Sequence, residues 1–75
     1  MREKIVEIIK EVSPEAYSYT GDNMMGEGAV DSFEIIEIVT AIEEELDIKI
    51  DAALVIAENF RNVDSIVSMV EGILQ

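Results

Sequence analysis

Apolar residues recur at helical spacing in three segments of this chain, and this periodicity constrains the fold more than any other feature. The stripe in residues 2–12 consists of Ile5, Ile8, Ile9 and Val12. The stripes in residues 32–46 and 62–74 are Ile35, Ile38, Val39, Ile42 and Leu46, and then Val63, Ile66, Val70 and Ile73. The first two sets follow the i, i+3, i+4, i+7 rule, the third is spaced i, i+3, i+7, i+10, and each covers one helix face. The pattern predicts three amphipathic helices around a shared core.

Length and composition fit such a bundle. A chain of 75 residues holds one domain, here residues 1–75. Acidic residues outnumber Lys and Arg by 17 to 5, which gives a net charge of −12, yet 49% of the residues are hydrophobic. That apolar content separates the chain from a disordered acidic tail. We expect an all-α fold, a small bundle of three longer helices and one short helix with a long first loop.

Residues 13–30 form the long first loop in this interpretation. Pro14 ends the first helix, because the residue before a proline avoids the helical region. A loop of this length is usually functional or held by anchors. The expected anchors are its large apolar and aromatic side chains, Tyr17, Tyr19, Met24, Met25 and Val30.

The remaining segments and helix ends are predicted from local signals. Residues 47–51 alternate in polarity without a partner strand, which indicates an extended connector with Ile48 or Ile50 turned inward. A short helix over residues 57–61 would place Phe60 in the core. Asn62 is suited to cap the last helix, and Asp31 to cap the second, with Glu34 three residues later as in a capping box.

Composition excludes several kinds of chemistry. The chain has no Cys and no His. It therefore lacks a disulfide framework, a thiolate nucleophile, an imidazole base and the commonest zinc ligands. We expect no catalytic constellation and no metal site, and so a protein that is not an enzyme.

The charge and hydropathy pattern also limit the partners. A net charge of −12 opposes binding to nucleic acid and to anionic membranes. No apolar run approaches the roughly 20 residues of a membrane span, and charges interrupt the N-terminus too often for a signal peptide. We expect a monomeric cytoplasmic protein whose partners carry basic patches.

Ser32 is the position at which the residues themselves suggest chemistry. It follows Asp31 at the predicted start of the second long helix. The unpaired N–H groups and the positive end of the helix dipole would favour a phosphate ester on its hydroxyl. The alternative is that Asp31 and Ser32 only cap the helix.

The outer face of this helix has two interpretations. Phe33, Ile36, Glu37, Thr40 and Glu44 lie off the apolar stripe. A solvated face does not need a phenylalanine and an isoleucine, so this face could be a docking surface. Alternatively, Phe33 and Ile36 could fold against the long loop.

A family resemblance links these features. It is carried by Gly28-Ala29-Val30-Asp31-Ser32-Phe33, by Ile38-Val39, by Ile42-Glu43-Glu44-Glu45-Leu46-Asp47-Ile48-Lys49-Ile50, by Glu58-Asn59-Phe60, and by Val63 and Ile66. In order and spacing these residues resemble the acyl carrier protein family over essentially the whole chain. Phe33 in place of the usual Leu, and Ala29 in place of a frequent Gly, look more like a specialised free-standing carrier.

The resemblance implies a function and assigns roles to residues. Ser32, with Asp31 beside it, would be the attachment point of 4′-phosphopantetheine, transferred from coenzyme A by a phosphopantetheinyl transferase. The arm's thiol would hold acyl intermediates as thioesters, as in fatty acid or polyketide biosynthesis. Phe33, Ile36, Glu37, Thr40 and Glu44 would be recognised by the transferase and by loading and downstream enzymes. An acyl chain could be sheltered near Ile35, Ile38, Ile42, Leu54, Ile56 and Phe60.

Two alternatives remain beside the acyl carrier. Within the same class, the protein could be an aminoacyl or peptidyl carrier, although that family is typically less acidic. In a different class, it could be an unmodified acidic helical domain that only binds other proteins.

Overall fold

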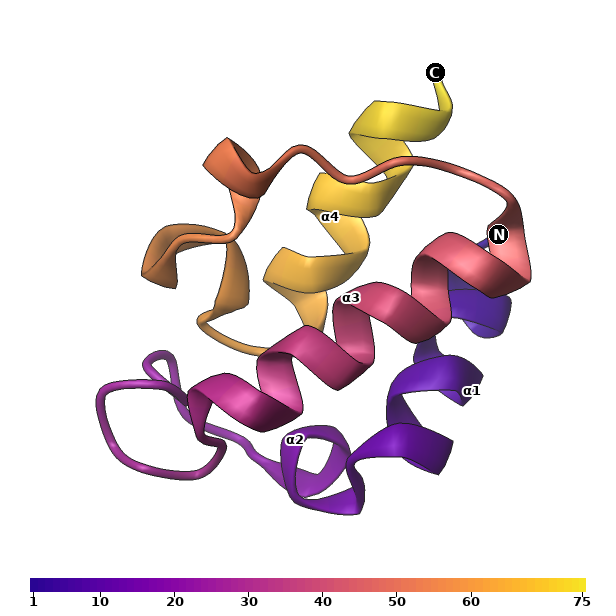
Figure 1. Ribbon diagram of the computed structural model, residues 1–75. Helices are drawn as coiled ribbons and strands as arrows, with labels where there is room; N and C mark the ends of the chain where they lie inside the picture. The colour runs from indigo at the N-terminus through magenta and orange to yellow at the C-terminus, as the bar shows by residue number, and fades with distance from the viewer.

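The computed structural model describes residues 1–75, and its regular elements are all helical. The α-helices are α1 (Arg2–Val12), α2 (Pro14–Ser18), α3 (Ser32–Leu46) and α4 (Val63–Leu74). Two short 3₁₀ helices, η1 (Ala52–Leu54) and η2 (Ala57–Phe60), connect α3 to α4. In Figure 1, α3 runs diagonally across the molecule, with α4 above it and α1 below. The predicted all-α bundle with three longer helices is confirmed.

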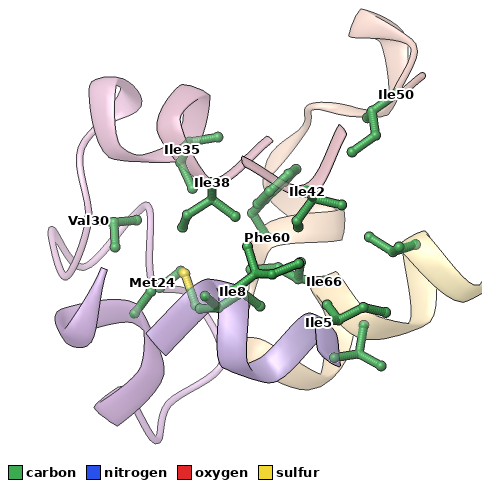
Figure 2. Close-up of a cluster of buried hydrophobic side chains, with 14 residues drawn as sticks. Ile5, Ile8, Met24, Val30, Ile35, Ile38, Ile42, Ile50, Phe60 and Ile66 are labelled. Carbon is green, nitrogen blue, oxygen red and sulfur yellow. The ribbon is translucent and has the colours of Figure 1, made fainter. Parts of the chain in front are cut away.

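The three predicted stripes meet in one core. The fully buried side chains include Ile5 and Ile9 of α1, Ile38 and Ile42 of α3, and Ile66 and Val70 of α4. Figure 2 shows Phe60 of η2 between Ile8 and Ile66, beneath the α3 side chains. Val39, Leu46, Val63 and Ile73 are only partly buried, at the edges of their stripes. The helices therefore pack as their periodicity predicts.

The first loop is interrupted by a helix that the sequence interpretation missed. Ser13 is the N-cap of α2, Pro14 occupies its first turn, and the Ser13 hydroxyl accepts a hydrogen bond from the Ala16 N–H at 3.2 Å. Proline suits the first helical position because its missing N–H would have no helical partner there. Pro14 thus ends α1 as predicted and also begins α2.

The predicted loop anchors divide into three groups. Met24 and Val30 are buried in the core, whereas Tyr19 and Met25 are partly buried against it. Tyr17 is 43% exposed, and the Lys10 ammonium lies 5.3 Å from the centre of its ring. The prediction for Tyr17 was wrong, because α2 turns this side chain toward solvent.

The tip of the loop is closed on itself around Tyr19. The Tyr19 hydroxyl is hydrogen-bonded to the Glu27 carboxylate and accepts the Asn23 N–H at 2.9 Å. The bond to Glu27 raises the pKa of the Tyr19 hydroxyl above its ordinary value, and desolvation acts in the same direction. The hydroxyl therefore remains protonated, and able to donate, at neutral pH. Gly28, with φ of 77°, then turns the chain toward α3.

Polar contacts join the loop to the start of α4. The Asp22 carboxylate accepts from the Arg61 guanidinium at 3.3 Å and from the Asn62 amide at 3.1 Å. The Met24 N–H donates to the Arg61 carbonyl at 3.0 Å. The loop that leads to Ser32 is thus fixed to η2 and α4 as well as to the core.

The connector after α3 follows its prediction in part. Asp47 ends α3 in the left-handed conformation, with φ of 54°, and Ile50 is buried while Ile48 is partly buried. The Glu43 carboxylate accepts the Ile50 N–H at 2.8 Å and so holds the connector against α3. Phe60 is buried, as expected for the short helix, which is of the 3₁₀ type. The η1 turn was not predicted.

Candidate functional site

Ser32 is the first residue of α3, and its side chain is exposed to solvent. Asp31 is the N-cap, and its carboxylate accepts the Glu34 N–H at 2.8 Å. The hydroxyl of Ser32 takes part in no hydrogen bond, and the N–H groups of Ser32 and Phe33 have no protein partner. A hydroxyl and two N–H donors are therefore available together at the positive end of a fifteen-residue helix.

The other four serines differ from Ser32 in their surroundings. Ser13 and Ser65 are buried and hydrogen-bonded. The Ser18 hydroxyl donates to the Pro14 carbonyl at 3.0 Å. Ser68 is exposed, but it lies in the middle of α4, where the backbone N–H groups are paired within the helix. Ser32 alone combines an exposed, unpaired hydroxyl with a helix start.

The expected capping box at α3 is only half formed. Asp31 caps the helix as predicted, but the Glu34 side chain does not return to it. Instead, the Glu34 carboxylate accepts the Ser13 hydroxyl at 2.8 Å. The complete capping box lies at α4, where Asn62 and Ser65 each accept the other's backbone N–H. The predicted N-cap Asn62 is confirmed, whereas its partner Ser65 was missed.

These groups define what the α3 start can do chemically. A phosphate ester on the Ser32 hydroxyl would be near unpaired N–H donors and the positive dipole end. The chain has no His that could act as a base toward this hydroxyl, and the Asp31 carboxylate is bound to the Glu34 N–H. These groups suit the Ser32 hydroxyl as the acceptor of a transferred group.

The predicted docking residues line one hollow beside Ser32 on α3. Phe33 is 71% exposed and Ile36 is 61% exposed. Their predicted partners in recognition are also exposed, namely Glu37, Thr40 and Glu44. All five residues border a shallow hollow of about 470 Å³. The alternative in which Phe33 and Ile36 fold against the loop is therefore wrong.

Two residues of this hollow could not be identified from the sequence. Val12 reaches it from the end of α1, and Ala41 from α3 itself. The periodicity assigned Val12 to the core, where it is partly buried. Its second role depends on where α1 ends against α3, which no local pattern reveals.

The residues proposed to shelter an acyl chain lie mainly in the core. Ile35, Ile38, Ile42 and Phe60 are buried, Leu54 is partly buried, and Ile56 is 46% exposed. None of the hollows described for the structure is lined by these side chains. An acyl chain could enter here only if α3 and the η1–η2 segment moved apart, so the shelter stays a prediction.

A hollow of about 720 Å³ lies elsewhere, between α1, the first loop and the start of α4. Its lining includes Tyr17, Tyr19 and the ion pair of Arg2 with Asp64. It contains neither Ser32 nor any other residue predicted to bind or recognise a partner. This hollow is therefore separate from the site at the start of α3.

No group of three or more carboxylates is arranged to hold a metal ion. None of the helices has the length and apolar character required to cross a membrane.

Comparison with known proteins gives the family. A protein-family model described as "Phosphopantetheine attachment site" matches residues 3–70, which is nearly the whole chain. The search of curated proteins and the search of solved structures each found no match. The exposed hydroxyl at a helix start fits covalent attachment of such an arm. The chain therefore belongs to the phosphopantetheine-binding carrier family, whose members are not catalysts but carry a covalently attached 4′-phosphopantetheine.

Proposed function

We propose that Ser32 is the residue to which the arm is attached. The proposal is carried by one observation: Ser32 alone among the five serines has an exposed, unpaired hydroxyl at a helix start. A phosphodiester formed there would be stabilised by the N–H groups of Ser32 and Phe33 and by the helix dipole. Asp31 would keep the first turn of α3 formed through its bond to the Glu34 N–H.

The cargo of this carrier is proposed to be an acyl group. When attached, the arm supplies a thiol on which the cargo is held as a thioester, which explains why a chain without Cys can perform this task. The net charge of −12 favours the acyl type over aminoacyl and peptidyl carriers, which are typically less acidic.

The partners would dock on the side of α3 that carries Phe33 and Ile36. This surface has an apolar centre of two exposed side chains, bordered by the carboxylates of Glu37 and Glu44. Carboxylates around an apolar centre suit an enzyme surface with a hydrophobic contact inside a basic patch. We propose that the transferase and the enzymes that load and use the cargo share this surface.

The assignment of Ser32 is tested by intact mass. Incubation with coenzyme A and a broad-specificity phosphopantetheinyl transferase should add one arm to the wild-type chain. Ser32→Ala should take no arm, because no other serine presents a free hydroxyl at a helix start. Its helical content by circular dichroism should be unchanged, since the Ser32 side chain makes no hydrogen bond that folding needs. An arm on Ser32→Ala would refute the assignment.

A further inference from the structure

A chain of hydrogen bonds connects the junction of α1 and α2 with the first turn of α3. The Ala16 N–H donates to the Ser13 hydroxyl at 3.2 Å, and this hydroxyl donates to the Glu34 carboxylate at 2.8 Å. The Glu34 N–H in turn donates to the Asp31 carboxylate at 2.8 Å. Ser13 and Glu34 are 21 residues apart in sequence, so this contact is tertiary and not a helix cap alone.

The location of this connection makes it strong. Ser13 is fully buried, and Glu34 is partly buried. A hydrogen bond to a carboxylate is stronger than one between neutral groups, and screening by water is reduced when one partner is buried. The Ser13 hydroxyl has one proton to donate, and this proton is committed to Glu34 while the oxygen accepts the Ala16 N–H.

The first turn of α3 has few other anchors. Phe33 and Ile36 point into solvent, and Ser32 makes no side-chain contact by hydrogen bonding. Ile35 is the one deeply buried side chain among residues 32–36. Helix ends open most easily where few buried contacts hold them. The bond from Ser13 to Glu34 is therefore a main restraint on the turn that carries Ser32.

We infer that Ser13 is a positioning residue for the attachment reaction, acting through Glu34 on the first turn of α3. This inference rests on the proposed function, because it takes Ser32 as the acceptor of the arm. Ser13 is buried and does not touch the arm or the transferase. Its effect is to hold the turn folded, so that the Ser32 hydroxyl and the N–H groups beside it keep one orientation during transfer.

The test uses the unmodified chain and two readouts. The first is hydrogen exchange of the Glu34 and Ile35 amides, both of which bond to Asp31 at the helix start. The second is steady-state arm transfer from coenzyme A, in which kcat and the KM for the carrier are measured separately. Ser13→Ala should lower exchange protection at both amides by about tenfold or more, the size of one net hydrogen bond to a charged group. It should lower kcat by a similar factor and leave KM nearly unchanged, because the docking surface is intact.

Variants of Glu34 separate the hydrogen bond from the charge. Glu34→Gln keeps an oxygen that can accept from Ser13 but loses the charge, so its protection and kcat should lie between those of the wild type and Glu34→Ala. Glu34→Ala removes the acceptor without altering the buried serine, and should reproduce the loss in protection and in kcat. The double variant Ser13→Ala with Glu34→Ala should lose no more protection at the Glu34 and Ile35 amides than Ser13→Ala alone, because both changes remove the bond between Ser13 and Glu34.

Two controls address general destabilisation. Ser18→Ala removes a serine hydroxyl from the same short helix, but one that bonds only to α2 carbonyls, so both readouts should stay at wild-type values. Val70→Ala destabilises the buried face of α4 and should leave kcat unchanged below its melting temperature.

The inference is overturned if Ser13→Ala and Glu34→Ala keep wild-type protection and kcat. It is also overturned if Val70→Ala, compared under conditions of equal free energy of unfolding, lowers kcat as much as Ser13→Ala and Glu34→Ala do. A failure of the proposed function looks different, since Ser32→Ala would then still accept an arm.

Discussion

The starts of α3 and α4 use serine in opposite ways. At α4 the Ser65 side chain is buried, and its hydroxyl accepts the N–H groups of Arg61 and Asn62 at 3.0 and 3.1 Å and lies 3.1 Å from the Asn59 carbonyl oxygen. At α3 the Ser32 hydroxyl is exposed and unpaired. A hydroxyl that completes the fold cannot also be offered to another protein. The two helix starts therefore separate a structural serine from one available for modification.

The largest stability change is expected from the structural serine. Ser65→Ala leaves the N–H groups of Arg61 and Asn62 without their acceptor in a part-buried site, and should lower the free energy of unfolding by about 2 kcal/mol. Urea denaturation measures this change. Arm addition, followed by intact mass at a temperature where the variant is folded, should remain complete. A stable variant, or one that takes no arm, would remove the distinction between the two serines.

Half of this comparison could be predicted from the sequence. The stripes, the Asp31 and Asn62 caps and the special position of Ser32 follow from local periodicity and cap preferences. The different hydrogen-bonding roles of Glu34 and Ser65 do not follow from these local patterns. Glu34 stands three residues after Asp31, as a capping box requires, yet its carboxylate accepts the Ser13 hydroxyl. Only the packing of α1 and α2 beside α3 brings that competing donor near.

The exposed face of α3 was also predicted only in part. Its residues fall off the apolar stripe, so the sequence indicated a surface, but it could not decide between solvent and the first loop. The first loop does not cover this face of α3. Met24 is buried in the core and its N–H donates to the Arg61 carbonyl, and Asp22 accepts from Asn62 at the start of α4. These contacts span about forty residues, and neither periodicity nor turn signals contain them.

The charges that border the hollow on α3 should affect transfer more than folding. Reversing both as Glu37→Lys with Glu44→Lys should slow arm transfer by about tenfold at low ionic strength, because attraction to a basic enzyme patch becomes repulsion. The effect should shrink with added salt. The melting temperature should be kept or raised, since both carboxylates are exposed and the chain carries an excess of negative charge.

Initial transfer rates at several salt concentrations and melting curves by circular dichroism check this prediction. Glu11→Lys with Glu15→Lys is a matched reversal of two exposed carboxylates outside the hollow on α3, and it should slow transfer less. An unfolded double variant, or equal rates for both reversals at low salt, would contradict a docking role for Glu37 and Glu44.

A smaller change is expected at the apolar centre of the same surface. Ile36→Ala removes an exposed side chain and should raise the KM of transfer by about threefold, with little dependence on salt, because the lost contact is apolar. Stability should change by less than about 0.5 kcal/mol. Steady-state kinetics at low and high salt measure the effect. A salt-dependent loss like that of the charge reversal would mean that Ile36 does not contact the partner directly.

The smallest effect concerns the excess charge. Three of the five cationic side chains are already in ion pairs, Arg2 with Asp64, Lys4 with Glu45 and Arg61 with Asp22. The Glu43 carboxylate also accepts the Ile50 N–H. Remaining repulsion around the end of α3 should be screened by salt, and millimolar magnesium should act more strongly. The melting temperature should rise by a few degrees. If neither salt nor magnesium changes the melting temperature, the ion pairs and the bond from Ile50 to Glu43 already relieve the repulsion.

The position of the arm on the wild-type chain tests the central claim most directly. After arm transfer from coenzyme A, cleavage at glutamate releases the peptide of residues 28–34, in which Ser32 is the only residue with a hydroxyl side chain. Tandem mass spectrometry should find the whole 4′-phosphopantetheine mass on this peptide and none on the peptides that contain Ser13, Ser18, Ser65 or Ser68. An arm found on any of those four serines would contradict the account.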